Sequence, residues 1–116
     1  MEQTQVLSSA GKNCWVGVNT ALANYLVKAA IEKGFLKNEL GPIKEIRSEV
    51  PYGREKRSRI DLLLEPDKQA FDKRSVYLEV KNTTWSKGCV ALFPDTVTTR
   101  GQKHLKELIG VLPESR

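Results

Sequence analysis

Two short runs of this chain carry side chains whose types and spacing suit metal-dependent chemistry. Asp61 lies in the run SRIDLLLE, and Glu79 and Lys81 lie in the run VYLEVKN. Alternating apolar and polar residues predict a β-strand for each run. If the strands pair antiparallel with Leu63 opposite Tyr77, Asp61 stands directly opposite Glu79, and we therefore expect one row with two carboxylates and an ammonium group.

The same register collects the aliphatic side chains on the other face of the sheet, which favours it over other registers. This apolar face would contain Ile60, Leu62 and Leu64 from one strand and Val76, Leu78 and Val80 from the other.

Two carboxylates that face each other repel, and a divalent cation between them removes the repulsion. Mg²⁺ prefers oxygen ligands, and one or two carboxylates with several waters usually hold it. We therefore expect Asp61 and Glu79 to be catalytic ligands of Mg²⁺ or Mn²⁺, and Lys81 to orient an attacking water or act as its base. This set suits phosphodiester hydrolysis. The alternative is that Glu79 and Lys81 are a common E-x-K spacing on a strand, with both side chains simply facing solvent.

The basic residues favour a polyanionic partner. The formal net charge is +5 and the sequence pI is 9.3, which is compatible with nucleic-acid binding without requiring it. Two groups are candidates for nucleic-acid contact, with a merely solvated surface as the alternative for each. The first comprises Arg54, Lys56, Arg57 and Arg59, and the second comprises Arg100, Gln102, Lys103 and His104.

Two helices and several strands should position these residues. Residues 4–18 predict a hairpin that turns at 8–11, and residues 19–33 predict a helix capped by Asn19 and followed by Gly34. Strands are predicted at 42–50, ending at Pro51, at 58–65, and from 76 onward, with a short strand near 90–93. The last helix is expected to begin near Thr99, in a capping box with Gln102. Its predicted buried stripe is Leu105, Leu108 and Ile109, and Pro113 should end it.

The composition indicates one domain over residues 1–116. No apolar run approaches the roughly 20 residues that span a bilayer, and the polar N-terminus does not resemble a signal peptide. The two cysteines, Cys14 and Cys89, are far apart and lack metal-ligand spacing, so we expect buried thiols and a cytoplasmic location. No membrane partner is expected.

The runs VGVNTALANYLV, SRIDLLL, YLEVKN and GCVALFPDTVTTRGQKHLKELI resemble the sugar fermentation stimulation protein (SfsA) family from about Trp15 to Ile109. The resemblance implies an α/β fold, a restriction-endonuclease-like PD-(D/E)XK core with a mixed β-sheet flanked by α-helices. On the resemblance Asp61 matches the metal-binding aspartate and Glu79 and Lys81 match the E-x-K pair. The matches to the family's other motifs are Asn19, Thr20, Glu49, Arg100, Gly101 and His104.

The resemblance also implies nucleic acid as the partner, with DNA favoured over RNA, and divalent-metal-dependent phosphodiester cleavage. The alternative is a non-catalytic DNA-binding regulator of sugar (maltose-type) metabolism genes, and a third interpretation is a stable but inert fragment. The resemblance further implies that family members are longer than this chain. They would have an N-terminal OB-like barrel and a last core strand that are absent from this chain. We therefore expect an exposed sheet edge through which a homodimer can form.

Overall fold

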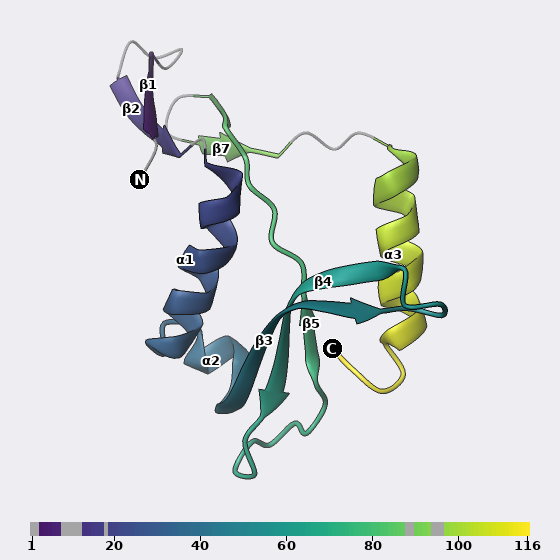
Figure 1. The fold of residues 1–116 in the computed structure, drawn as a ribbon. Helices are drawn as coiled ribbons and strands as arrows, with labels where there is room; N and C mark the ends of the chain where they lie inside the picture. Colours follow the sequence, from purple (N-terminus) through teal and green to yellow (C-terminus); the bar gives the residue numbers. More distant parts are fainter. Residues whose placement is uncertain (1–2, 8–12, 18, 88–89, 94–96) are drawn as a thin grey trace.

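The computed structural model describes residues 3–7, 13–17, 19–87, 90–93 and 97–116. In chain order, two strands are followed by two helices, five strands and a last helix (Figure 1). The elements are β1 (Gln3–Leu7), β2 (Asn13–Gly17), α1 (Thr20–Glu32), α2 (Lys37–Leu40), β3 (Ile43–Tyr52), β4 (Ser58–Pro66), β5 (Val76–Leu78), β6 (Trp85–Lys87), β7 (Val90–Leu92) and α3 (Thr99–Val111). The fold is mixed α/β. The predicted turn at 8–11 and Cys89 lie outside the described residues.

The central sheet has the strand order β3-β4-β5, and both pairings are antiparallel. One face packs on α1 and α2, where Ile31 of α1 joins Leu62 and Leu64 in a buried cluster. The other face packs on α3, where Leu108 and Val111 contact a second cluster. The sheet therefore lies between two helical layers (Figure 1). Two further hairpins, β1-β2 and β6-β7, pair only within themselves among the described residues.

At one point along the β3-β4 hairpin, the buried side chains change from the α1 side of the sheet to the α3 side. Leu62, Leu64 and Ile46, the partner of Leu64, belong to the α1 side, but Ile60 and its partner Val50 belong to the α3 side. Between them, Glu49 has a φ of 55°, a left-handed conformation that is uncommon for a residue with a side chain. The ribbon bends sharply along this hairpin (Figure 1). The expectation that Ile60 shares a face with Leu62 is therefore wrong, because strict alternation does not continue through the bend.

The predicted caps of α1 are confirmed. The Asn19 side chain accepts a hydrogen bond from the Leu22 N–H at 3.2 Å. At the other end Gly34 has a φ of 78°, and the N–H groups of Gly34 and Phe35 donate to the carbonyls of Ile31 and Ala30, each at 3.0 Å. This pair of bonds closes a helix whose next residue must be left-handed, which glycine permits.

Several predictions about the strands and the last helix are wrong in detail. β3 continues through Pro51 to Tyr52, which is tolerated because β3 lies at an edge of the described sheet and the missing N–H is not needed there. The side chain that caps α3 is Thr98, one residue earlier than expected, and it accepts from the Gly101 N–H at 3.0 Å. β5 is only three residues long, and α2 was not predicted.

The buried stripe of α3 also differs from the prediction. Leu105 and Ile109 are each 62% exposed, whereas Leu108 and Val111 contact the second cluster. A helix places residues three or four positions apart on one face, so spacing alone allowed either set. The side that α3 turns inward is decided by the bent end of the β3-β4 hairpin, which a helical period does not encode.

The C-terminal residues run along the outer edge of β5. Ser115 bridges Ser75 in parallel, the Tyr77 N–H donates to the Arg116 carbonyl at 2.7 Å, and the Arg116 N–H donates to the Ser75 carbonyl at 2.9 Å. Part of the edge that was expected to be exposed is therefore paired. Among the described residues, no helix has the length and apolar character needed to cross a membrane.

Candidate functional site

Asp61 lies on β4 at the bend of the hairpin, and groups from two other elements fix its carboxylate. The side-chain amide of Asn24 in α1 donates to Oδ1 at 3.1 Å, and the backbone N–H of Val80 donates to Oδ2 at 2.7 Å. The Val80 N–H thus binds a side chain, and the β4-β5 ladder ends at Leu78. β5 is therefore short because the Val80 N–H bonds to the Asp61 side chain and not to the backbone of β4.

Glu79 follows β5 directly and connects it to α3. Its Oε1 accepts a hydrogen bond from Lys81 Nζ at 2.8 Å and lies 3.4 Å from His104 Nδ1. The side chains of Glu79 and His104 are only 18% and 19% exposed, whereas Lys81 is 55% exposed. Glu79 is therefore a largely covered carboxylate, and the long, exposed side chain of Lys81 contacts it from the solvent side.

The register between β4 and β5 is the one predicted, since Leu62, Leu63 and Leu64 pair with Leu78, Tyr77 and Val76. The described pairing ends one residue before Asp61 on β4 and one residue before Glu79 after β5, so the predicted opposition of Asp61 and Glu79 stays a prediction. Those two carboxylates act on a common neighbour, the buried phenol of Tyr52. Burial raises the pKa of Tyr52 first, and the charges of Glu79, Glu107 and Asp61 raise it further. Negative charge is thus concentrated at this end of the sheet.

A pocket of about 450 Å³ opens beside the carboxylates. It lies between α1, the segment that follows β5 and the first turns of α3. Its lining residues are Ala23, Asn24, Val80, Lys81, Asn82, Thr98, Arg100, Gly101 and His104. Lys81 and Arg100 supply cationic groups, and amide and hydroxyl groups supply hydrogen bonds, so the pocket suits an anionic group that approaches Asp61 and Glu79.

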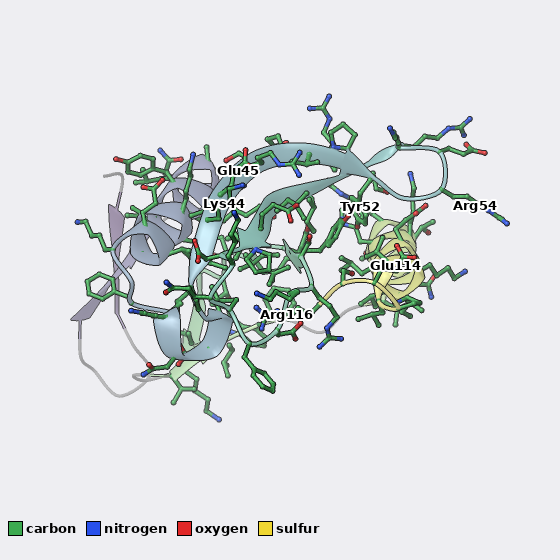
Figure 2. The ribbon with its side chains drawn as sticks, turned by 90° about the horizontal axis from the view of Figure 1, so that it is seen from below. Lys44, Glu45, Tyr52, Arg54, Glu114 and Arg116 are labelled. Atoms are coloured by element: carbon green, nitrogen blue, oxygen red, sulfur yellow. The ribbon has the colours of Figure 1, made fainter. Side chains whose placement is uncertain are left out.

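The first basic group lies elsewhere, at the tip of the β3-β4 hairpin. Gly53 begins this turn with a φ of 88°, and the Arg54 N–H donates to Oε2 of Glu107 at 3.3 Å. Figure 2 shows Arg54 at the end of the hairpin, beyond Tyr52 and directed outward. Glu107 is seven residues beyond Arg100, which corresponds to about 10 Å along a helix. The tip is therefore displaced along α3 from the pocket.

The predicted site residues consequently form two groups. The structure brings together Asp61, Glu79, Lys81, Arg100 and His104. The hairpin tip with Arg54, Lys56 and Arg57 is displaced from them, Arg59 is exposed on β4 two residues before Asp61, and Gln102 and Lys103 are exposed on α3. At the tip, Arg57 pairs with Glu55 at 2.7 Å, but both side chains are largely exposed, so this pair has little value for stability.

Sequence reasoning missed Asn24 and Tyr52. Asn24 begins a helical face that continues with Val27 and Ile31, both in or against the first cluster. Asparagine is a poor residue for a helix interior, and this mismatch was a usable signal. Tyr52 gave no comparable signal, because an aromatic residue at the end of a strand is ordinary.

The donor set is small. Among the residues that the structure describes, no group of three or more histidine, cysteine, aspartate or glutamate side chains is arranged to hold a metal. Asp61 and Glu79 supply two carboxylates, which is a usual protein contribution to Mg²⁺ but not to a fully protein-enclosed metal.

These features define a small α/β domain in which a three-stranded sheet separates two helical layers, and in which Asp61 and Glu79 each contact residues that line a pocket containing Lys81 and Arg100. Residues 21–116 match the family model described as the sugar fermentation stimulation protein RE domain. The chain belongs to the sugar fermentation stimulation protein family.

Several curated relatives are closely similar. The chain is 69% identical over 115 residues to the sugar fermentation stimulation protein homolog of Prochlorococcus marinus (strain MIT 9303), covering 99% of this chain and 44% of that protein. Identity is 65% to the homolog of Synechococcus sp. (strain CC9311) and 67% to that of P. marinus (strain MIT 9313), each over 99% of this chain and 46% of the relative. The chain thus spans less than half the length of these relatives.

Proposed function

We propose that this domain binds nucleic acid and hydrolyses phosphodiester bonds with a divalent metal, on a restriction-endonuclease-like PD-(D/E)XK core. The observation that supports the proposal is a pocket that contains Lys81 and Arg100 and whose other lining residues hold both carboxylates. Asn24 and Val80 bind Asp61, and Lys81 and His104 contact Glu79. Carboxylates for a metal, an amine for a water and a guanidinium for a phosphate are then available within one site.

The residues present fit Mg²⁺ or Mn²⁺. A hard cation needs carboxylate oxygens with free lone pairs, and each oxygen of Asp61 accepts one described hydrogen bond, which leaves further acceptor capacity. Both described partners of Glu79 approach Oε1, so no described hydrogen bond uses Oε2. A bound Mg²⁺ would polarise the phosphoryl oxygen and activate a water. Asp61 and Glu79 would hold it.

The other side chains have separate tasks in this proposal. Lys81 is exposed enough to exchange its contact with Glu79 for a hydrogen bond to the attacking water, which it would orient or deprotonate. Arg100 at the first turn of α3 would bind the phosphate oxygens, and His104 would hold Glu79 from the opposite side or contact the leaving group. The hairpin tip would bind the nucleic-acid backbone away from the reacting bond.

A cleavage assay tests the proposal. Labelled single- and double-stranded DNA and RNA are incubated with Mg²⁺, Mn²⁺ or EDTA, using the wild type, Lys81→Ala and a control, Lys68→Ala, in an exposed loop at the other end of β5. Cleavage should require metal, should survive in Lys68→Ala, and should fall by roughly 10²–10⁴ in Lys81→Ala. Equal cleavage by Lys81→Ala and Lys68→Ala would remove Lys81 from the mechanism.

The second candidate function is non-catalytic DNA binding in the control of sugar metabolism genes. The separation of the hairpin tip from the carboxylates favours it, because contacts to a nucleic-acid backbone there need no metal. This function predicts tight binding to DNA, no cleavage with any metal and no effect of Lys81→Ala. DNA is favoured over RNA in both proposals.

The chain spans less than half the length of its relatives. We propose the same activity for a longer protein that contains this domain. An added barrel would supply a second surface for a single strand. A homodimer would use the part of the β5 edge beyond the pairing of Ser115 and Arg116, and sedimentation over a range of concentrations would detect it.

A further inference from the structure

We infer that Asn24 is a positioning residue that holds Asp61 ready for a metal. The inference rests on the proposed metal site and extends it to Asn24 of α1, a residue to which neither the charge pattern nor the family match assigned a role. Asn24 joins three features, since it belongs to α1, donates to Asp61 and lines the pocket.

The geometry fixes the plane of the Asp61 carboxylate. A carboxylate on a flexible side chain turns about its last torsion, which is broad for aspartate. Here Asn24 donates to one oxygen at 3.1 Å and the Val80 N–H donates to the other at 2.7 Å. Donors from α1 and from the segment after β5 therefore hold the two oxygens from different elements, and rotation would break both bonds.

The helix that carries Asn24 is itself well fixed. Asn19 caps its first turn, and Gly34 closes its last turn. Ile31, seven residues after Asn24, is buried against the sheet. A donor on such a rigid element fixes its acceptor more closely than a donor on a loop does.

Stability does not explain an asparagine at this position. Asn24 heads the face that continues with Val27 and Ile31, where the helical pattern would place an apolar residue. Leucine has a clearly better helix propensity than asparagine. Asn24 is therefore better explained by its hydrogen bond to Asp61 than by the packing or the propensity of α1.

The test measures Mn²⁺ binding directly by isothermal titration calorimetry. Four proteins are compared with the wild type: Asn24→Leu, which keeps the branched side-chain skeleton and removes the donor, Asn24→Ala, Asp61→Asn, and the control Asn38→Leu on the exposed helix α2. Groups that orient a metal ligand typically contribute 10–100-fold to metal affinity. We expect that loss in both Asn24 variants and wild-type affinity in Asn38→Leu.

Two further measurements separate positioning from folding. The metal-free melting temperature of Asn24→Leu and Asn24→Ala should not fall by more than that of Asn38→Leu, because the apolar residues suit the helix. In cleavage, the Mn²⁺ concentration for half-maximal rate should rise 10–100-fold, while the rate at saturating Mn²⁺ stays within a few-fold of wild type. If Asn24→Leu is too unstable to measure, Asn24→Ala carries the same expectation without added bulk.

The outcomes distinguish this inference from the proposed function. Wild-type Mn²⁺ affinity in both Asn24 variants, with affinity lost in Asp61→Asn, would overturn the role of Asn24 and leave the metal site intact. Unchanged affinity in Asp61→Asn, or no Mn²⁺ binding by the wild type, would overturn the metal site and the role of Asn24 together.

Discussion

The left-handed conformation of Glu49 at the hairpin bend leads us to predict that a strand-favouring substitution there destabilises the protein. Valine is normally favoured in strands, yet Glu49→Val should destabilise the protein. Glu49 has a φ of 55°, a conformation that costs an L-residue about 1–2 kcal/mol and suits a β-branched residue least of all. Glu49 already bears part of this cost, and a β-branched residue lies toward the upper end of the roughly 1–3 kcal/mol range for left-handed residues. We therefore expect Glu49→Val to lower the free energy of unfolding by about 1–2 kcal/mol.

The same strand offers a matched control. Glu45 is exposed on β3, opposite Glu65, with no left-handed φ. Glu45→Val should be neutral or stabilising by up to about 1 kcal/mol, since it adds a strand-forming residue and removes a like-charge pair. Glu49→Gly should be close to neutral, because the relief of strain is offset by the roughly 0.5–1 kcal/mol that glycine loses in entropy.

The assay is urea unfolding of the three variants and the wild type, followed by circular dichroism. A change in the midpoint at constant slope reports stability alone. If Glu49→Val and Glu45→Val shift the midpoint in the same direction, the bend is not built on Glu49. The account of why Ile60 and Leu62 face different helices would then be wrong.

Three further predictions concern the turn, the buried phenol and the basic tip. Gly53→Ala should destabilise by about 1–2 kcal/mol in thermal unfolding, because Gly53 is left-handed and an added Cβ would lie 2.1 Å from Oε2 of Glu107; wild-type stability would argue against this contact. The pKa of Tyr52 is raised above 10.0 by burial and by Glu79, so its contribution to stability is complete below pH 10 and is lost as the pH rises through the folded-state value. Wild type should therefore lose stability above pH 10 more steeply than Tyr52→Phe, and parallel curves from denaturant unfolding would contradict this. Replacing the tip cations Arg54, Lys56 and Arg57 by alanine should flatten the log–log salt dependence of duplex DNA binding by up to about 2.7, at roughly 0.9 per lost phosphate contact; an unchanged slope would mean that the tip is only a solvated surface.

The sequence predicted the residues of the candidate site better than the way in which they are held. Alternation fixed the register that sets Leu63 against Tyr77, because any shift would have exposed the aliphatic face. It did not predict that Val80 would leave the ladder to bond Asp61, since that bond depends on the position of a side chain on another strand. Asn24 escaped notice for the same reason.

Local signals succeeded where the physics is local. Asn19 and Gly34 act within one helical turn, and both caps were predictable. The inward side of α3 was not, because Leu105 and Leu108 fit a helix equally well and the choice between them depends on the hairpin bend. No local pattern at Glu49 predicts that bend.

The central claim is that Asp61 and Glu79 hold one divalent cation, and the metal-dependent melting temperature tests it most directly. Wild type, Asp61→Asn and the control Asp67→Asn, in the loop after β4, are melted with Mn²⁺ or Mg²⁺ and with EDTA. At a metal concentration 100 times the dissociation constant, binding to the folded state adds about 2.7 kcal/mol of stability. The account predicts this gain in wild type and Asp67→Asn and its loss in Asp61→Asn. An equal gain in all three proteins would contradict it.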